Sequence, residues 1–279
     1  MTRALSAAAS SLPAAWGGTW LALAALWAFA VFGPQVAMRL GAAGHLPHGL
    51  AYLGLLLVLV FFKLMTLGAL YRVALFGKDA RKEGLGLGGV QFHMPEVRLF
   101  GAGIMVGLFM LLIAATLFVV FAIALKLTGL EGLADASPAH PWGVVDFSQP
   151  VFWFIVGYLV LSLVLLVFLT AKFALFHAAT VAERRMVTLN ALGLSSGNVG
   201  KLFAGLMVMI LPLLVVACLL FHHMHRQFVL SPRPPALDTP HLHLVLHAVM
   251  AGLAIFAILP LAAGFLSSAY RQIIKLRSE

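Results

Sequence analysis

Charged residues are scarce in this sequence, and acidic residues are the scarcest of them. Only 10% of the 279 residues are charged, and the 9 Asp and Glu residues are outnumbered by 18 Lys and Arg residues. An ordinary soluble domain carries about 25% charged residues. Because a soluble fold needs polar side chains to cover its surface, this shortage excludes an ordinary water-soluble domain.

Cysteine and recognisable catalytic patterns are almost absent as well. Cys218 is the single cysteine, so no internal disulfide can form, and there is no H-E-x-x-H zinc-protease motif. None of the nine carboxylates falls in the long apolar stretches. Coupled transporters and intramembrane aspartyl enzymes normally need an acid at depth. We recognise no catalytic constellation and predict that the protein is not an enzyme.

Long apolar runs dominate what is present. Hydrophobic residues make up 62% of the chain, and the mean hydropathy is +1.05. A helix needs about 20 mostly apolar residues to cross the roughly 30 Å hydrocarbon core. The sequence therefore predicts an all-α, polytopic transmembrane bundle of six helices, forming a single integral membrane domain over residues 1–279. The predicted spans are 16–38, 49–70, 99–125, 151–175, 202–220 and 244–266.

The basic residues are distributed unevenly between the two sides of such a bundle. If the spans alternate in direction, only Arg39, Lys126, Arg226 and Arg233 lie on one side, and Lys63 lies within a span. The other side holds thirteen: Arg3, Arg72, Lys78, Arg81, Lys82, Arg98, Lys172, Arg184, Arg185, Lys201, Arg271, Lys275 and Arg277. By the positive-inside rule, this predicts a multi-pass protein of a bacterial cytoplasmic (inner) membrane, with both termini cytoplasmic.

The two long connectors on the basic side have the pattern of short amphipathic segments, of which Val181–Leu192 is an example. Basic residues there would meet the anionic cytoplasmic leaflet favourably. We expect lipid head-group contact from Lys78, Arg81, Lys82, Arg184 and Arg185. Nucleic-acid binding is not expected, because no basic domain with interleaved aromatics lies outside the membrane.

Histidine gathers on the opposite side, which holds nine of the eleven. Residues three or four apart share a helix face, so His222 can point with His225, and His243 with His247. Four imidazoles from two helix ends would suit Zn, Cu or Ni. The alternative is that they are interfacial histidines with no ligand. A haem held by His177 and His247 is disfavoured, because these two lie toward opposite faces of the membrane.

Proline and glycine punctuate the spans and one connector. Gly33-Pro34 is expected to kink its helix, with the freed backbone groups satisfied by neighbours. Pro212 and Pro260 are expected to kink their helices likewise. The run Gly84–Gly89 lacks the Lys-Ser/Thr of a phosphate-binding P-loop. We expect it to be a hinge or a closely packed loop.

Four short segments in the connectors carry a family resemblance: 71–77, 95–99, 172–182 and 196–202. Together they resemble a group of uncharacterised bacterial six-helix inner-membrane proteins. That group is distantly similar to the membrane domain attached to some glycerophosphodiester phosphodiesterases. The resemblance implies a six-helix topology; it implies no reaction and carries over no catalytic residue.

These observations predict a non-enzymatic membrane protein that binds or organises lipid or a membrane-protein partner. The alternative is transport. The kinked helices could pass an uncharged or lipidic solute, or the histidines of the opposite side could capture a transition metal. No cofactor is expected apart from that possible metal.

Overall fold

The computed structural model describes residues 2–43, 47–127, 150–230 and 240–278. Within these ranges every regular element is helical. The helices of six residues or more are α1 (Thr2–Ala42), α2 (His48–Phe76), α3 (Met94–Leu127), α4 (Pro150–Phe173), α5 (Phe176–Glu183), α7 (Val199–Leu230), α8 (Pro240–Gly252), the π-helical turn η4 (Leu253–Ile258) and α9 (Leu259–Ser278). The shorter ones are η1 (Gly77–Arg81), η2 (Leu87–Gly89) and α6 (Asn190–Leu194).

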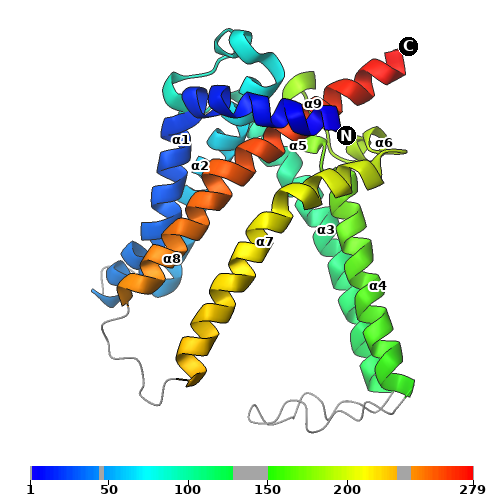
Figure 1. The fold of residues 1–279 in the computed structure, drawn as a ribbon. Helices are drawn as coiled ribbons and strands as arrows, with labels where there is room; N and C mark the ends of the chain where they lie inside the picture. The colour runs from blue at the N-terminus through cyan, green and yellow to red at the C-terminus, as the bar shows by residue number, and fades with distance from the viewer. Residues whose placement is uncertain (1, 44–46, 128–149, 231–239, 279) are drawn as a thin grey trace.

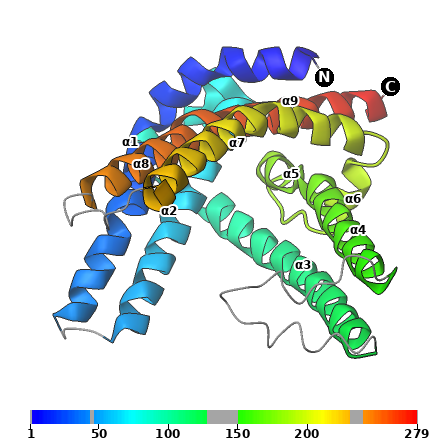
Figure 2. The same ribbon diagram turned by 60° about the horizontal axis from the view of Figure 1, so that its bottom comes forward.

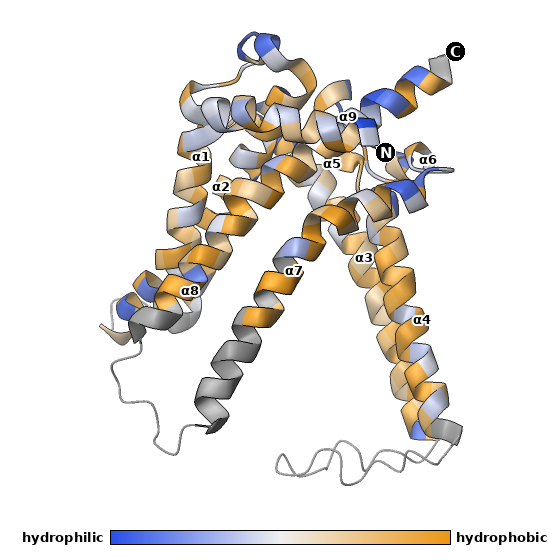
Figure 3. Ribbon diagram, viewed as in Figure 1, coloured by the Kyte–Doolittle hydropathy of each residue, from blue (hydrophilic) through white to orange (hydrophobic). Residues whose placement is uncertain are grey.

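Six helical stretches in the described residues are long and apolar enough to cross a membrane. Each overlaps one of the six predicted spans, and the predicted all-α bundle is confirmed. The most apolar segment of the stretch that includes α3 has a mean hydropathy of 3.0, and none of its residues is buried within the protein. Figure 3 shows apolar residues along the shafts of α3 and α4 and polar residues gathered near the helix ends. The chain is a multi-pass membrane protein.

The helices form two arms that meet at one end (Figure 1). One arm contains α1, α2 and the nearly continuous helix α8–η4–α9, with α7 beside them. The other arm is the α3–α4 hairpin, which diverges from the first in both views (Figures 1 and 2). The connectors η1–η2 and α5–α6 lie where the arms meet. We call this the basic end, because it carries Lys78, Arg81, Arg184 and Arg185; the start of α1 and the end of α9 also lie there.

Helix α1 begins much earlier than the predicted span at residue 16. Its first turns lie across the basic end beside α9 (Figure 1). Ala4 and Ala8 are buried, and a Cβ on Gly264 of α9 would stand 3.1 Å from the Cα of Ala8. Small residues on both helices allow this close backbone approach, which explains why the Ala-rich segment before the span is helical.

The second connector differs from the expected amphipathic segment Val181–Leu192. Helix α5 ends at Glu183, and α6 begins only at Asn190. Arg184 between them adopts a left-handed conformation with φ 53°, which a continuing α-helix does not allow. The turn is closed by Thr180, whose Oγ1 accepts the backbone N–H of Val187 at 3.2 Å. The connector is therefore two short helices joined by a turn.

The glycine run forms a closely packed loop. Gly88 and Gly89 have φ values of 61° and 80°, which residues with a Cβ rarely adopt. A Cβ on Gly89 would stand 2.9 Å from the Cα of Thr19, and one on Gly88 would stand 2.6 Å from the Cβ of Leu21. The loop is thus seated against α1, and the packed-loop alternative is the one observed.

Pro34 lies inside α1 and frees a carbonyl group that another helix satisfies. Proline has no N–H to donate to the residue four positions earlier, which here is Ala30. The Ala30 carbonyl oxygen lies 3.2 Å from Nε2 of His247 in α8. The expectation that neighbours would satisfy the freed groups is confirmed at this proline.

Pro260 shows the same arrangement in the last transmembrane stretch. The π-helical turn η4 directly precedes Leu259-Pro260, and π-turns are a common cause of irregularity in a helix. The carbonyl of Phe256, four residues before the proline, accepts the indole N–H of Trp16 at 2.7 Å. Two helix irregularities therefore provide acceptors that hold α1 against α8 and η4.

Candidate functional site

A buried ion pair joins the end of α2 to the start of α3. The side chains of Arg72 and Glu96 are 2% and 0% exposed. Nη2 of Arg72 donates a 3.0 Å hydrogen bond to Oε2 of Glu96. It also lies 2.8 Å from Oε1, in an ionic contact without hydrogen-bond geometry. Oε2 accepts the backbone N–H of His93 at 2.9 Å, so Glu96 also caps the first turn of α3.

The position of this carboxylate depends on a glycine. Gly68 lies one turn before Arg72 on α2, and a Cβ there would stand only 2.3 Å from Oε1 of Glu96. Within the described part of the chain, Nη1 of Arg72 is buried without a hydrogen-bond partner. The guanidinium therefore depends on Glu96 for its counter-charge.

Glu96 adds to the observation that no carboxylate falls within a predicted span. It lies outside the predicted span 99–125, yet it belongs to α3 and is fully buried inside the protein. In the sequence, Glu96 stood out only as part of the segment 95–99 that carries the family resemblance. Burial of a carboxylate is possible here because a cation and a backbone N–H neutralise and solvate it.

Aromatic rings continue the contact between α2 and α5. Tyr71, next to Arg72, stacks on His177 with ring centroids 5.7 Å apart and planes within 5° of parallel. Phe176 lies against the same imidazole at 3.7 Å between centroids. His177 thus packs between aromatic rings at the basic end, and His247 lies in α8, where it contacts Ala30.

A second set of polar contacts binds the connectors to one another. Nη2 of Arg184 lies 2.6 Å from Oε2 of Glu83, and the carbonyl of Arg184 accepts a hydrogen bond from Nη1 of Arg98. On the other side of the turn, Glu183 pairs with Arg185 at 2.6 Å. Glu183 also accepts the hydroxyl of Tyr270 at 3.1 Å. The first connector, α3, α5 and α9 are thereby joined at one turn.

The five predicted head-group residues all lie at the basic end, but they differ in what they contact. Arg184 and Arg185 form the ion pairs just described, which are partly exposed. Lys82 pairs with Asp79 at 2.8 Å, with both side chains mostly in solvent, so the pair adds little stability. Lys78 and Arg81 are exposed, and neither forms an ion pair with another described residue.

The predicted metal ligands are only partly within the described residues. His222 and His225 belong to the last turns of α7 and His243 to the start of α8, but their side chains lie outside the described part. His247 is described, and its Nε2 faces the Ala30 carbonyl, which leaves only Nδ1 for a metal. No cluster of three possible metal-ligating residues occurs among the described residues, and the metal site stays a prediction.

One serine fits a catalytic motif that the sequence reasoning overlooked. Gly193-Leu194-Ser195-Ser196-Gly197 matches the G-x-S-x-G pattern of hydrolase nucleophile elbows. That elbow needs a strand before the serine and an exposed hydroxyl. Here helix α6 precedes it, Ser195 is 0% exposed, and its hydroxyl donates to the carbonyl of Leu192 at 3.2 Å. The motif is a helix-ending turn in this context.

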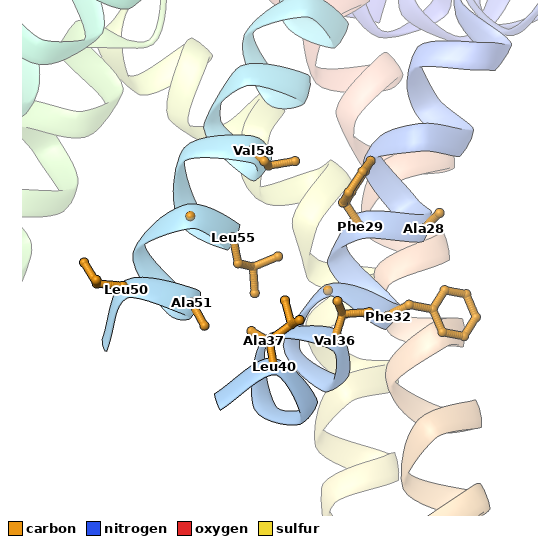
Figure 4. Close-up of a pocket in the computed structure, with 12 residues that line it drawn as sticks. Ala28, Phe29, Phe32, Val36, Ala37, Leu40, Leu50, Ala51, Leu55 and Val58 are labelled. Carbon is orange, nitrogen blue, oxygen red and sulfur yellow. The ribbon is translucent and has the colours of Figure 1, made fainter. Parts of the chain in front are cut away.

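An apolar pocket of about 450 Å³ lies between α1 and α2, away from the basic end. Gly33 lines it from α1, and Figure 4 shows Leu55 of α2 projecting toward α1. A Cβ on Gly33 would stand 2.3 Å from Cδ1 of Leu55, so glycine allows the two helices to approach. All its lining side chains are apolar, which gives the pocket no means to recognise a polar ligand.

Comparison with known proteins adds no relative. A scan against family models, a search of curated proteins and a search of solved structures each found no match. The resemblance based on the connectors therefore stays a prediction, and the charged groups of the basic end are the strongest guide to function.

Proposed function

We propose that this protein resides in the cytoplasmic membrane of a bacterium with both termini in the cytoplasm, and that its basic end binds anionic lipid. The role is non-enzymatic: it organises lipid, or a membrane-protein partner, at the inner surface of the bilayer. The uneven distribution of Lys and Arg supports this orientation.

The proposal depends mainly on one observation: the glutamates of the basic end are buried or already paired with arginines. Glu96 is buried against Arg72, and the side chains of Glu83 and Glu183 are 26% and 23% exposed and already paired with arginines. The one exposed acid nearby, Asp79, pairs with Lys82, and the exposed cations Lys78 and Arg81 form no ion pair with a described carboxylate. Each such cation near an anionic leaflet contributes about 1 kcal/mol of attraction.

Neutralising these two cations tests the proposal. The K78Q/R81Q variant should lose about 2 kcal/mol of attraction to anionic lipid, which corresponds to a roughly 30-fold weaker preference. The measurement is the enrichment of phosphatidylglycerol over phosphatidylcholine in the lipid that stays with the purified protein, after exchange into mixed vesicles.

The matched control is R39Q/K126Q, which removes the same charge from the opposite end. It should leave the phosphatidylglycerol enrichment near the wild-type value. Equal loss in the two variants would show that only net charge matters and would contradict a specific role for the basic end. No loss in K78Q/R81Q would contradict the proposal directly.

A further inference from the structure

A second surface at the basic end combines an apolar groove with positive charge. Helices α4 and α7 approach each other there and diverge toward their other ends (Figures 1 and 2). A groove of about 460 Å³ lies between them, lined only by apolar residues, a volume typical of ligand sites. The lining includes Leu163, Phe168 and Ala171 of α4 and Gly200 of α7.

The depth of the groove corresponds to one leaflet. Its lining on α4 runs from Leu163 to Ala171, close to the end of the helix at Phe173. At a rise of 1.5 Å per residue this stretch covers about 12 Å, and half of the hydrocarbon core is about 15 Å. The groove therefore has the depth of one acyl chain of the leaflet next to the basic end. A partner helix would need a surface that continues across the whole core.

The end of the groove nearest the basic end is positively charged. Nζ of Lys172 lies 5.4 Å from the ring centroid of Phe168, which lines the groove. Lys201 directly follows Gly200 and borders, with Asn198, a smaller pocket of about 120 Å³ on the same turn. No Asp or Glu is among the described residues that line either pocket. The first turn of α7 adds the positive end of its helix dipole.

We infer that this groove binds one anionic phospholipid, with an acyl chain between α4 and α7 and the phosphate between Lys172 and the first turn of α7. The inference rests on the proposed function, because it requires the basic end to face an anionic leaflet. It goes further in assigning a single stoichiometric site to residues other than the exposed Lys78 and Arg81. The apolar lining of the groove matches the acyl chain of such a lipid, and the lysines at its basic end match the phosphate.

Gly200 offers a direct way to fill the groove. A Cβ at this position would meet no heavy atom within 4 Å, so a phenylalanine can enter the space without displacing the backbone. Gly157 in α4 is equally open and does not line the groove. G157F is therefore the matched control for G200F. Circular dichroism of both variants shows that each is folded before lipid binding is compared.

Native mass spectrometry of the protein titrated with phosphatidylglycerol, or with phosphatidylcholine of the same chains, tests the site. Wild type and G157F should retain one phosphatidylglycerol molecule, and G200F should lose it. K172Q/K201Q should bind that molecule about 30-fold more weakly. K78Q/R81Q should still retain it, because those residues lie outside the groove.

Three outcomes would overturn the inference. If G200F retains the lipid and only K78Q/R81Q loses it, the groove is wrong and the proposed function stands. If phosphatidylcholine is retained equally well, the lysines do not select the head group and the anionic assignment is wrong. If no variant, wild type included, retains or enriches anionic lipid, the groove and the proposed function both fail.

Discussion

A side chain at Gly68 would occupy the space of the Glu96 carboxylate, so glycine at this position allows the ion pair between α2 and α3 to form. The carboxylate lies where the glycine's side chain would be, and from there it reaches both Arg72 and the first turn of α3. A buried pair of this kind is a weak source of net stability, but breaking it by removing one partner is costly. We therefore expect the pair to contribute more to how α2 and α3 meet than to net stability.

Gly68→Ala should destabilise the protein by about 1–3 kcal/mol, because the added methyl group overlaps Oε1 of Glu96 and the carboxylate has to move. The measurement is the free energy of unfolding in detergent, followed by tryptophan fluorescence. Gly54→Ala on the same helix is the control. A Cβ at Gly54 meets nothing within 4 Å, so this change should be neutral or stabilising by up to about 1 kcal/mol. Equal effects of the two substitutions would contradict the assigned role.

Glu96→Leu should cost about 3–5 kcal/mol, since it leaves the buried guanidinium of Arg72 without a counter-charge. The double variant R72M/E96L removes both charges and should recover most of that loss. The same unfolding measurement applies. A double variant as unstable as the single one would show that the carboxylate acts through the cap on His93 and not through Arg72.

At the scale of whole helices, the irregularities of α1 and of the α8–η4–α9 stretch are also their points of attachment. Pro34 frees the Ala30 carbonyl for His247, and the carbonyl four residues before Pro260 accepts Trp16. Trp27 adds a third side-chain contact between α1 and α8, donating its indole N–H to the Ala248 carbonyl at 2.9 Å. Apolar packing between lipid-exposed helices lacks a strong hydrophobic driving force, so these hydrogen bonds contribute to their association.

His247→Phe should cost about 0.5–1.5 kcal/mol by removing the donor to Ala30. In a Pro34→Ala background residue 34 regains its N–H, and the same substitution should cost less. A double-mutant cycle of unfolding free energies measures the difference. Additive effects would mean that His247 does not act on the carbonyl freed by Pro34.

Considered as a whole, the molecule is two apolar arms joined at a charged end. The ion pairs among the described residues lie at that end, where Arg184 also accepts a hydrogen bond from Arg98 and Tyr270 contacts Glu183. The shafts expose their apolar side chains, as the outer surface of a protein in lipid does. Charged contacts are thus concentrated at the basic end, where we also place the lipid contacts.

The proposed orientation can be tested with single cysteines, because Cys218→Ser leaves a cysteine-free chain. Arg81→Cys and Leu189→Cys, one in each connector, should react with a membrane-impermeant maleimide only when the cytoplasmic face is accessible. Arg39→Cys should react from the opposite face. Labelling of the two connectors from different sides would contradict the topology and everything placed at the basic end.

The sequence alone determined the medium, the number of spans and the grouping of the basic residues, because each depends on the length and composition of continuous segments. It also foresaw that neighbours would satisfy the groups freed by proline, since hydrocarbon offers no water to do so. These properties depend on local sequence, and a run of about twenty apolar residues predicts a membrane span in any fold.

Only the tertiary structure decided which groups meet. Glu96 looked like a connector residue until α2 placed Gly68 and Arg72 beside it, and only the packing of α8 against α1 showed that His247 faces a carbonyl of α1. The motif at Ser195 follows helix α6 and not a strand, so it lacks the surroundings of a nucleophile elbow. Such pairings join residues far apart in the chain, and their burial depends on helix packing, which the periodicity of one segment does not encode.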